Sequence, residues 1–252
     1  MKLLALDTSS PWTSCALCES DASGAPVRVL AESLHGPPLK AGDLLPGALA
    51  ALCAQAHVTL QDVQGLAVGL GPGSFTGLRV GLAAAKALAY ALRLPLAGCS
   101  SLAALALSAR SEASGQSIAP TLEARRGELY ASLYGSAGEA QLLVWPEGVY
   151  QAEAFAERVR SLPSLPLVVG PGAQANHARL GGLAVQGPVA PLAWAVAQLC
   201  AEPLAQARFD PALCFALAPN YLQPSMAEVA LREGKVGGLP AAKSGGAARG
   251  PV

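Results

Sequence analysis

The stretch Gly65–Leu92, GLAVGLGPGSFTGLRVGLAAAKALAYAL, joins a short apolar run to a long segment rich in Ala and Leu through a glycine-rich turn. The apolar run Gly65–Gly69 predicts a buried strand, and Thr76–Leu92 predicts a long helix. A strand that leads into a helix through a tight turn is a building unit of α/β folds. The stretch therefore predicts an α/β architecture, and the sequence on both sides extends the pattern.

The order of predicted elements in the first half of the chain repeats in the second half. The first half has predicted strands over Lys2–Asp7, Thr13–Glu19, Val27–Leu34, Gly65–Gly69 and Pro95–Cys99, and helices from a cap at Asp43 to about Ala56, over Thr76–Leu92, and from a cap at Ser100 or Ser101 to about Ala109. The second half has predicted strands over Ile118–Glu123, Glu128–Tyr134, Gln141–Trp145, Leu167–Gly170 and Val185–Gly187, and helices over Ala152–Arg160, Ala173–Leu180 and Leu192–Ala201. Both halves read βββαβαβα. This duplication predicts an α/β fold of actin-like (ASKHA or ribonuclease H-like) architecture with two subdomains.

Changes in composition indicate the domain boundaries. We expect an N-terminal actin-like subdomain over residues 1–110, which carries the partner or dimer interface, and a C-terminal actin-like subdomain over residues 117–232. The segment Ser111–Gln116 would join them. Residues 233–252 are rich in glycine and lack apolar periodicity, which predicts a disordered tail.

Charge and cysteine content narrow the functional classes. The 252-residue chain carries 17 basic and 17 acidic side chains, so no net positive charge favours nucleic-acid binding by the chain alone. No apolar run reaches the length of a membrane span, and the first residues do not resemble a cleavable signal, so we expect a cytoplasmic protein. Cys15 and Cys18 would point to opposite faces of one strand, which favours buried thiols over a zinc site.

The glycine-rich turn does not match the common phosphate-binding or nucleophile motifs. A P-loop needs a Lys directly after its glycines, the third glycine of a dinucleotide fingerprint would come one residue late, and Ser74 lacks the flanking glycines of a nucleophile elbow. Anion binding by the free N–H groups of the turn and by Arg79 is one remaining reading. Two further readings, contact with this protein's own sheet and contact with another chain, stay open for a stripe of small residues spaced four apart on the following helix: Gly77, Gly81, Ala85 and Ala89.

Four stretches together resemble the TsaB (YeaZ) family. The longest is GLGPGSFTGLRVGLAAAKALAYALRLPLAGCSSLAAL at Gly69–Leu105. The others are LALDTSS at Leu4–Ser10, EARRGELYASLY at Glu123–Tyr134 and PNYLQ at Pro219–Gln223. The first stretch is long and specific, and the other three support it.

The resemblance implies a part in the synthesis of threonylcarbamoyladenosine in tRNA (t6A37). It implies a non-catalytic scaffold that binds and activates the transferase TsaD as a heterodimer, together with the ATPase TsaE, with tRNA bound through the complex. Homologues also self-associate, so a homodimer is a further expectation, whereas no membrane or DNA partner is expected. No cofactor is expected to bind this chain tightly, and ATP or ADP with Mg²⁺ would bind only at the interface with partners.

Two groups of candidate site residues follow, and neither group is expected to include a catalytic residue or a metal ligand. The partner interface is expected to include Asp43, Gly73, Ser74, Phe75, Thr76, Gly77, Arg79, Gly81, Ala85, Lys86 and Ala89. A phosphate or nucleotide contact is expected at Asp7, Thr8, Ser9, Arg125, Arg126 and Glu128.

The phosphate candidates also have structural readings. Asp7 could hold a hydrated Mg²⁺, but capping the turn between two strands is favoured. Arg125 and Arg126 could meet a phosphate at a shared interface, or face water at the tip of a hairpin. Gly170-Pro171-Gly172 resembles the adenosine-side loop of related enzymes, but an ordinary turn at the start of a helix is favoured.

The chain departs from the family pattern at two places. The family reads D-A-R where this chain has Glu123-Ala124-Arg125, which keeps the charge but lengthens its reach. The family's H-S-E before the first long helix is replaced by Ala41-Gly42-Asp43, so no metal ligand is expected there. An alternative function remains open, that of an autonomous ATP-dependent phosphotransferase or hydrolase of the actin-like class, which would bind nucleotide without partners.

Overall fold

The computed structural model describes residues 1–21, 25–135, 143–183 and 185–232. The chain divides into two units, residues 1–222 and residues 223–252. The second unit contains the short helix α8 (Met226–Arg232), which the sequence analysis did not predict. At its start the Ser225 amide donates to Glu228 Oε2 at 2.6 Å, and the Glu228 amide donates to Ser225 Oγ at 3.2 Å. The predicted disordered tail over residues 233–252 lies outside the described residues.

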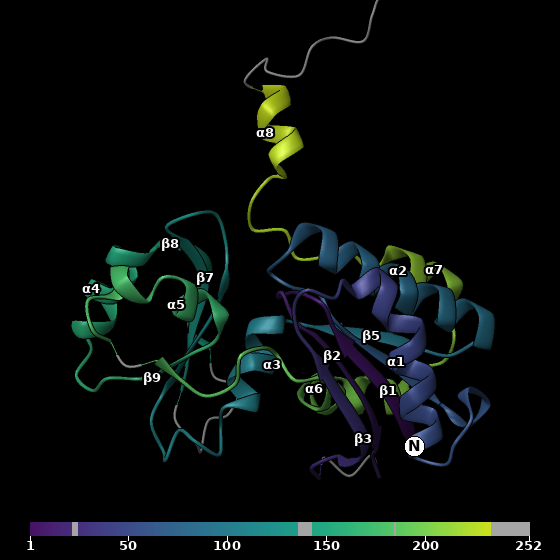
Figure 1. Ribbon diagram of the computed structural model, residues 1–252. Helices are drawn as coiled ribbons and strands as arrows, with labels where there is room; N and C mark the ends of the chain where they lie inside the picture. Colours follow the sequence, from purple (N-terminus) through teal and green to yellow (C-terminus); the bar gives the residue numbers. More distant parts are fainter. Residues whose placement is uncertain (22–24, 136–142, 184, 233–252) are drawn as a thin grey trace, which may run out of the picture. The chain divides into compact units, whose positions relative to one another are not determined.

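Two five-stranded mixed sheets form the frame of residues 1–222 (Figure 1). The first sheet contains β1 (Lys2–Asp7), β2 (Thr13–Glu19), β3 (Arg28–His35), β4 (Gly65–Gly69) and β5 (Leu96–Cys99), in the order β3-β2-β1-β4-β5. The second contains β6 (Ile118–Glu123), β7 (Glu128–Tyr134), β8 (Leu143–Gln151), β9 (Leu167–Val169) and β10 (Val185–Gln186), in the order β10-β9-β6-β7-β8. In each sheet the first strand of the repeat is central, pairs antiparallel with the second strand and parallel with the fourth. The predicted duplication is confirmed.

Helices cover both faces of each sheet. α1 (Ala41–Gln55) and α2 (Phe75–Leu92) pack on one face of the first sheet, and α6 (Ala193–Gln206) packs on the other. α4 (Ala152–Arg160) and α5 (Pro171–Ala175) pack on one face of the second sheet, and α3 (Ser101–Ser108) packs on its other face and against α6. The last helix of the second repeat thus covers the sheet of the first repeat.

The two faces of the first sheet follow from the alternation of side chains along a strand. On β1, Leu4 and Leu6 enter the core under α1 and α2, while Leu3 and Ala5 enter the core under α6. Because both faces are covered, β1 reads as a continuous apolar run rather than an alternating one.

The cysteine pair on β2 follows the same alternation. Cys15 lies on the α1 and α2 side and Cys18 on the α6 side, which confirms the expectation of opposite faces. Both side chains are fully buried, and burial raises the pKa of each thiol to about 12. The two thiols are therefore core side chains.

Several boundaries differ from those predicted. α1 begins at Ala41 with Lys40 in the capping position, so Asp43 lies in the first turn and is not the cap. β8 continues to Gln151, and α6 continues past Pro203 because its later turn still buries Leu204. A further unpredicted helix, α7 (Pro211–Ala216), begins after Asp210, whose carboxylate accepts from the Ala212 amide at 2.8 Å.

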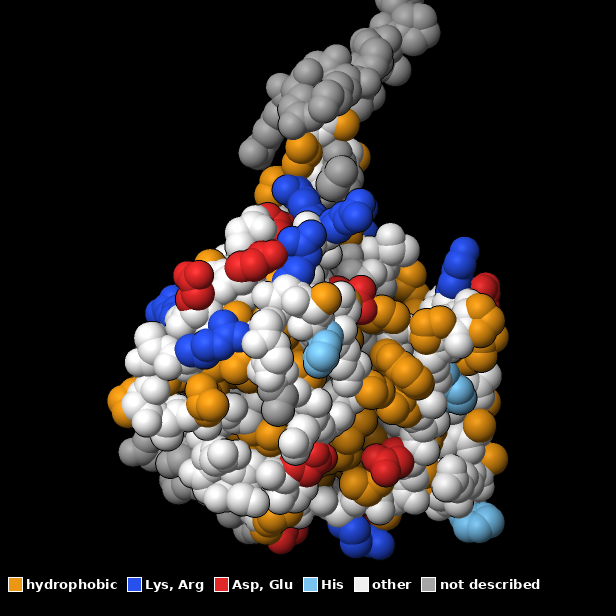
Figure 2. Space-filling view, turned by 60° about the vertical axis from the view of Figure 1, so that its left-hand side comes forward, with side chains coloured by type: hydrophobic (Ala, Val, Ile, Leu, Met, Phe, Trp, Pro, Cys, Tyr) orange, Lys and Arg blue, Asp and Glu red, His pale blue; other side chains and the backbone are white. Residues whose placement is uncertain are grey.

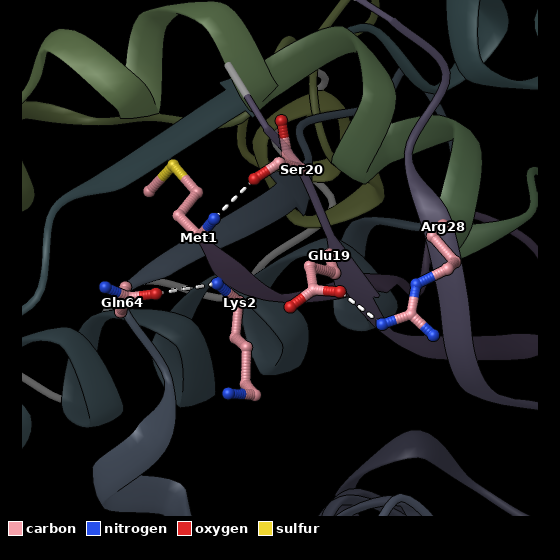
Figure 3. Close-up of polar contacts among 6 residues, drawn as sticks. All are labelled: Met1, Lys2, Glu19, Ser20, Arg28 and Gln64. Atoms are coloured by element: carbon pink, nitrogen blue, oxygen red, sulfur yellow. Dashed lines mark hydrogen bonds and ion pairs between the residues drawn. The ribbon is translucent and has the colours of Figure 1, made fainter.

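Polar contacts hold the start of β1 in place (Figure 3). The Met1 amino group donates to the Ser20 carbonyl, and the Lys2 amide donates to Gln64 Oε1 at 2.9 Å. Arg28 pairs with Glu19 across β2 and β3. This pair is solvent-exposed, so it contributes little to stability but agrees with the register of the two strands.

Within the described part of the chain, α2 alone is long and apolar enough in composition to cross a membrane. Its apolar residues have an evident role in this fold. Leu78, Leu82, Ala85 and Ala89 are buried beside the first sheet, so one face of the helix belongs to the core.

Candidate functional site

The glycine-rich turn packs directly against the turn between β1 and β2. A Cβ atom added to Gly73 would lie 2.1 Å from the Ser9 carbonyl oxygen, and one added to Gly77 would lie 2.1 Å from the Thr8 carbonyl oxygen. The Ser74 amide donates to the Ser9 carbonyl at 2.7 Å, and Thr8 Oγ1 donates to the Gly77 carbonyl at 2.8 Å. The glycines allow two backbone segments to approach each other, as close packing requires.

The stripe of small residues on α2 continues this contact with the protein's own sheet. A Cβ atom on Gly81 would lie 2.2 Å from Thr8 Oγ1 and 3.2 Å from Leu6 Cδ1. Ala85 and Ala89 are 1% and 0% exposed in the same core. The expectation that Gly81, Ala85 and Ala89 contact a partner is therefore corrected: their small side chains are buried against the protein's own first sheet.

Asp7 caps the turn after β1, as the favoured reading predicted. Its Oδ1 accepts from the Ser9 amide at 2.8 Å and from Ser9 Oγ at 2.6 Å, and its Oδ2 accepts from Ser101 Oγ at 2.6 Å. The side chain is 1% exposed, and burial raises the pKa of the carboxyl group. Asp7 and Ser9 are thus closed off by their own neighbours, and a phosphate cannot reach them in this arrangement.

A cavity of about 380 Å³ lies where the starts of α1 and α2 meet the end of β1 and the start of β2. It brings together five residues of the two predicted groups: Thr8, Asp43, Ser74, Thr76 and Gly77. Its other lining residues are Ser10, Pro11, Thr13, Leu39, Lys40, Ala41, Gly42 and Val80. The sequence analysis missed Lys40, although it is the basic residue directly before the first long helix.

A second cavity of about 390 Å³ brings together the phosphate candidates of the second half. Arg125, Arg126 and Glu128, on the turn between β6 and β7, line it with Arg179 and Asn176. The sequence analysis missed Arg179, which also pairs with Glu153 at 2.7 Å in an exposed contact. Among the described residues, Thr8 of the Asp7 turn and Arg125 line different cavities, so neither of these two cavities combines the phosphate candidates of the two halves.

Acidic and neutral polar side chains line the second cavity together with its arginines. Asn176 is 9% exposed, and its Nδ2 donates to the Gly172 carbonyl at 2.9 Å and to the Glu128 carbonyl at 3.4 Å. Burial raises the pKa of Glu123, the residue that stands in place of the family's Asp. The face drawn in Figure 2 likewise carries both basic and acidic side chains.

The exposed end of α2 is tied to the segment that follows α6. The Phe75 ring stacks on Tyr221 with ring centroids 4.6 Å apart, and the Arg79 guanidinium lies 4.0 Å from the Phe75 centroid. Arg79 Nε also donates to the Tyr221 hydroxyl at 3.3 Å, and Lys86 Nζ donates to the Phe215 carbonyl at 2.8 Å. These predicted interface residues therefore also hold the C-terminal segment of this chain in place.

A half-buried carboxyl group that was not predicted from the sequence connects the two repeats. Glu147 on β8 accepts from Ser100, the N-cap of α3, and from the Tyr134 hydroxyl at 3.3 Å. Its other oxygen accepts from Asn220 Nδ2 at 3.0 Å. Burial raises the pKa of Glu147, with the three hydrogen bonds acting in the opposite direction. Among the described residues, no group of three His, Cys, Asp or Glu side chains is arranged to hold a metal ion.

The duplicated mixed sheets and the glycine-rich strand-turn-helix unit define an α/β protein with the actin-like fold. The first sheet carries the glycine-rich turn at the edge where β1 and β4 end, and the second carries the arginine turn between β6 and β7.

Comparison with known proteins places the chain more closely. A family described as TsaD: tRNA N6-adenosine threonylcarbamoyltransferase matches residues 42–159. The "tRNA threonylcarbamoyladenosine biosynthesis protein TsaB" of Escherichia coli K12 is 35% identical over 121 residues, 46% of this chain and 51% of that protein. The protein of the same name from Bacillus subtilis 168 is 35% identical over 134 residues, 53% of this chain and 55% of that protein. The chain thus aligns with about half the length of the curated relatives it matches.

Solved structures extend the match across the fold. YeaZ from Pseudomonas aeruginosa superposes with a TM-score of 0.70 at 27% identity, over 88% of this chain and 99% of that one. A second Pseudomonas aeruginosa structure, described as similar to peptidase YEAZ, gives the same TM-score at 29% identity. The resemblance to the TsaB (YeaZ) family drawn from the four sequence stretches is therefore confirmed.

Proposed function

We propose that this chain is a non-catalytic subunit of the system that makes N6-threonylcarbamoyladenosine at position 37 of tRNA. In this proposal it binds and activates a TsaD transferase in the cytoplasm, together with a TsaE ATPase, and tRNA reaches it through the complex. The observation that carries the proposal is the 35% identity of about half of this chain to proteins named for this biosynthesis. The match to YeaZ over most of the fold supports the same conclusion.

The geometry of the Asp7 turn favours a supporting role over catalysis by this chain. Both carboxylate oxygens of Asp7 accept hydrogen bonds from the protein, and the group is shielded from solvent. A Cβ atom on Gly69 would lie 1.8 Å from Asp7 Oδ2, so the backbone at Gly69 also packs directly against the carboxylate. An actin-like kinase or ATPase would need this turn open to phosphate, and for that reason the autonomous phosphotransferase or hydrolase is the weaker alternative.

The partner surface that we propose is the solvent side of α1 and α2, opposite the buried stripe. Thr76, Ala83 and Ala87 on α2 are exposed, as are Gly47 and Ala51 on the adjacent helix α1. Short side chains on two adjacent helices let the helices of another subunit approach closely. Because residues 42–159 match the TsaD family, the two subunits would be related in structure, and related subunits commonly pair through equivalent surfaces.

Co-purification with TsaD tests this proposal. We expect the wild-type chain to form a stable complex, and Ala83→Arg or Ala87→Arg to abolish it because a long charged side chain holds the helices apart. Ala154→Arg, on the exposed face of α4, is the matched control and should leave the complex intact. Circular dichroism of each variant must show the wild-type fold. A complex that survives both α2 substitutions places the interface elsewhere, and failure of the wild-type chain to bind TsaD refutes the partnership.

Function is measured by mass spectrometry of tRNA nucleosides. In a strain depleted of this protein we expect N6-threonylcarbamoyladenosine to fall, and to return with the wild-type chain but not with Ala83→Arg. Calorimetry and a turnover assay of the pure chain with Mg-ATP separate the alternative function, since an autonomous enzyme must both bind nucleotide and cleave or transfer its phosphate without partners. Tight binding and turnover by the chain alone would favour the alternative.

A further inference from the structure

The cavity between the starts of α1 and α2 has the features of an anion site. The first amides of a helix lack partners within the helix, and the helix dipole gives them a partial positive charge. Two long helices begin at this one cavity, α1 with 15 residues and α2 with 18. Their positive ends therefore act on the same space.

The start of α1 is not capped by this chain. The N-cap is Lys40, a side chain that cannot accept a hydrogen bond, and no side-chain cap is formed. Within the described residues, the Ala41 and Gly42 amides have no acceptor, since the first bonds of the helix come from Asp43 and Leu44 to the Lys40 carbonyl. Gly42 has no side chain to obstruct these amides; the nearest atom to a Cβ there, Val80 Cγ1, would be 4.0 Å away. α2 differs, because Ser74 Oγ accepts from the Gly77 amide at 3.2 Å.

A buried hydroxyl group in the cavity wall gives independent support. Thr13 is 3% exposed and lines the cavity from the start of β2, on the same side of the strand as Cys15 and Leu17. Its hydroxyl makes no hydrogen bond to the described residues, whereas the hydroxyl groups of Thr8 and Ser10 are both bonded within the protein. A ligand atom in the cavity can therefore accept from this hydroxyl, which the described part of the protein leaves without an acceptor.

The charges at the cavity set the sign of the ligand. Lys40 makes no ion pair with a carboxylate in the described part of the chain, and its ammonium group adds a full positive charge beside the helix ends. Asp43 is the one acidic residue among the described residues that line the cavity, and it opposes anion binding. The cavity walls at Pro11, Leu39 and Val80 are apolar, so they neither attract nor repel an anion.

We propose that this cavity binds the phosphate group of a small molecule, either inorganic phosphate or a phosphate monoester such as a nucleotide. The phosphate oxygens would accept from the Ala41 and Gly42 amides, from the Thr13 hydroxyl and from the Lys40 ammonium group. The site borders the Asp7 turn through Thr8 and Ser10, but it does not include the Asp7 carboxylate, which is closed off within the protein. The inference goes beyond the proposed function, because it concerns the isolated chain and does not depend on TsaD.

Titration of the isolated full chain with inorganic phosphate, followed by ¹H–¹⁵N spectra at constant ionic strength, tests the site. We expect saturable shifts of the Ala41 and Gly42 amides. Lys40→Gln should weaken binding by about tenfold, the effect of losing a hydrogen bond to a charged group. Thr13→Val, which keeps the shape of the side chain, should also weaken it, and Asp43→Asn should tighten it. Lys2→Gln, which removes a positive charge elsewhere, is the control and should leave the affinity unchanged.

Three results would overturn the proposal. These are amide shifts that do not saturate, wild-type affinity in Lys40→Gln, and an affinity in Asp43→Asn no higher than that of the wild type. Titrations with adenosine and adenosine 5′-monophosphate then distinguish a nucleotide from inorganic phosphate as the ligand. Tighter binding of the monophosphate than of inorganic phosphate identifies a nucleotide, whose base or sugar would contact the apolar wall. Equal binding of the two identifies inorganic phosphate. Binding of adenosine as tight as that of its monophosphate would also refute recognition through phosphate. Loss of phosphate binding with an intact TsaD complex would leave the proposed function standing.

Discussion

Replacing Gly81 with alanine should destabilise the protein, although alanine is the better helix former. On an open helix face this substitution gains about 1 kcal/mol. At Gly81 the new methyl group would lie 2.2 Å from Thr8 Oγ1, far inside van der Waals contact. Thr8 Oγ1 donates to the Gly77 carbonyl at 2.8 Å, so moving it breaks a hydrogen bond as well as the packing. Overpacking costs about 1–3 kcal/mol, and the lost hydrogen bond about 1 kcal/mol.

The net loss for Gly81→Ala is therefore about 1–3 kcal/mol of unfolding free energy, which lowers Tm by roughly 2–12 °C for a unit of this size. Gly47→Ala is the matched control, because α1 exposes this residue and nothing lies within 4 Å of the added Cβ. We expect Gly47→Ala to raise Tm by about 2–4 °C through helix propensity alone.

Urea and thermal unfolding followed by circular dichroism measure both variants. A third variant isolates the clash: in a Thr8→Ala background, which removes Oγ1, Gly81→Ala should cost at least about 0.5 kcal/mol less than in the wild type. If Gly81→Ala stabilises the chain as Gly47→Ala does, the stripe does not pack on β1 and the assignment of the partner surface to the opposite face loses its basis.

Three further predictions concern buried groups and the C-terminal segment. The carboxyl groups of Asp7 and Glu147 both have raised pKa values, so above about pH 4 the folded state binds more protons than the unfolded state. The free energy of unfolding should therefore fall as pH rises through this range. The urea concentration at the unfolding midpoint should fall less steeply with pH in Asp7→Asn than in the wild type. Because the pKa values of Cys15 and Cys18 are about 12, iodoacetamide at pH 8 should label them, by mass spectrometry, only as fast as the chain unfolds. Tyr221→Ala should cost about 1 kcal/mol in thermal unfolding through the lost stack on Phe75, whereas Tyr221→Phe should cost less.

The elements predicted most accurately are those with strong local signals. β1, β2, β4, β6, β7 and α4 have the predicted bounds, because each is a short apolar run or an amphipathic repeat between clear turns. α7 was missed because it has only 6 residues and too few turns for a periodic pattern, although Asp210 followed by Pro211 is a recognisable helix start. Local pattern therefore predicts an element when the element is long enough to repeat.

What an element packs against depends on residues far apart in sequence. The four-residue spacing on α2 correctly predicted a close contact, but spacing alone does not distinguish β1 of the same chain from a helix of another chain. The Glu147 cluster is a stronger case, because it joins Ser100, Tyr134 and Asn220 across the two repeats. Asn220 lies in one of the four stretches that resemble the family, yet nothing in that stretch indicated its partner.

The separation of the two phosphate candidate turns bears on how a ligand could be held. If a single chain of this duplicated fold bound a nucleotide without a partner, we would expect the turns of both halves to contact the nucleotide. In this chain the Asp7 carboxylate accepts hydrogen bonds from Ser9 and Ser101. Arg125 and Arg126 line a cavity to which the first half contributes no lining residue among those described. A phosphate group at the arginines would therefore lack the contacts expected from the first half. This asymmetry agrees with the expectation that a nucleotide would bind only at the interface with a partner subunit, which would supply the missing contacts.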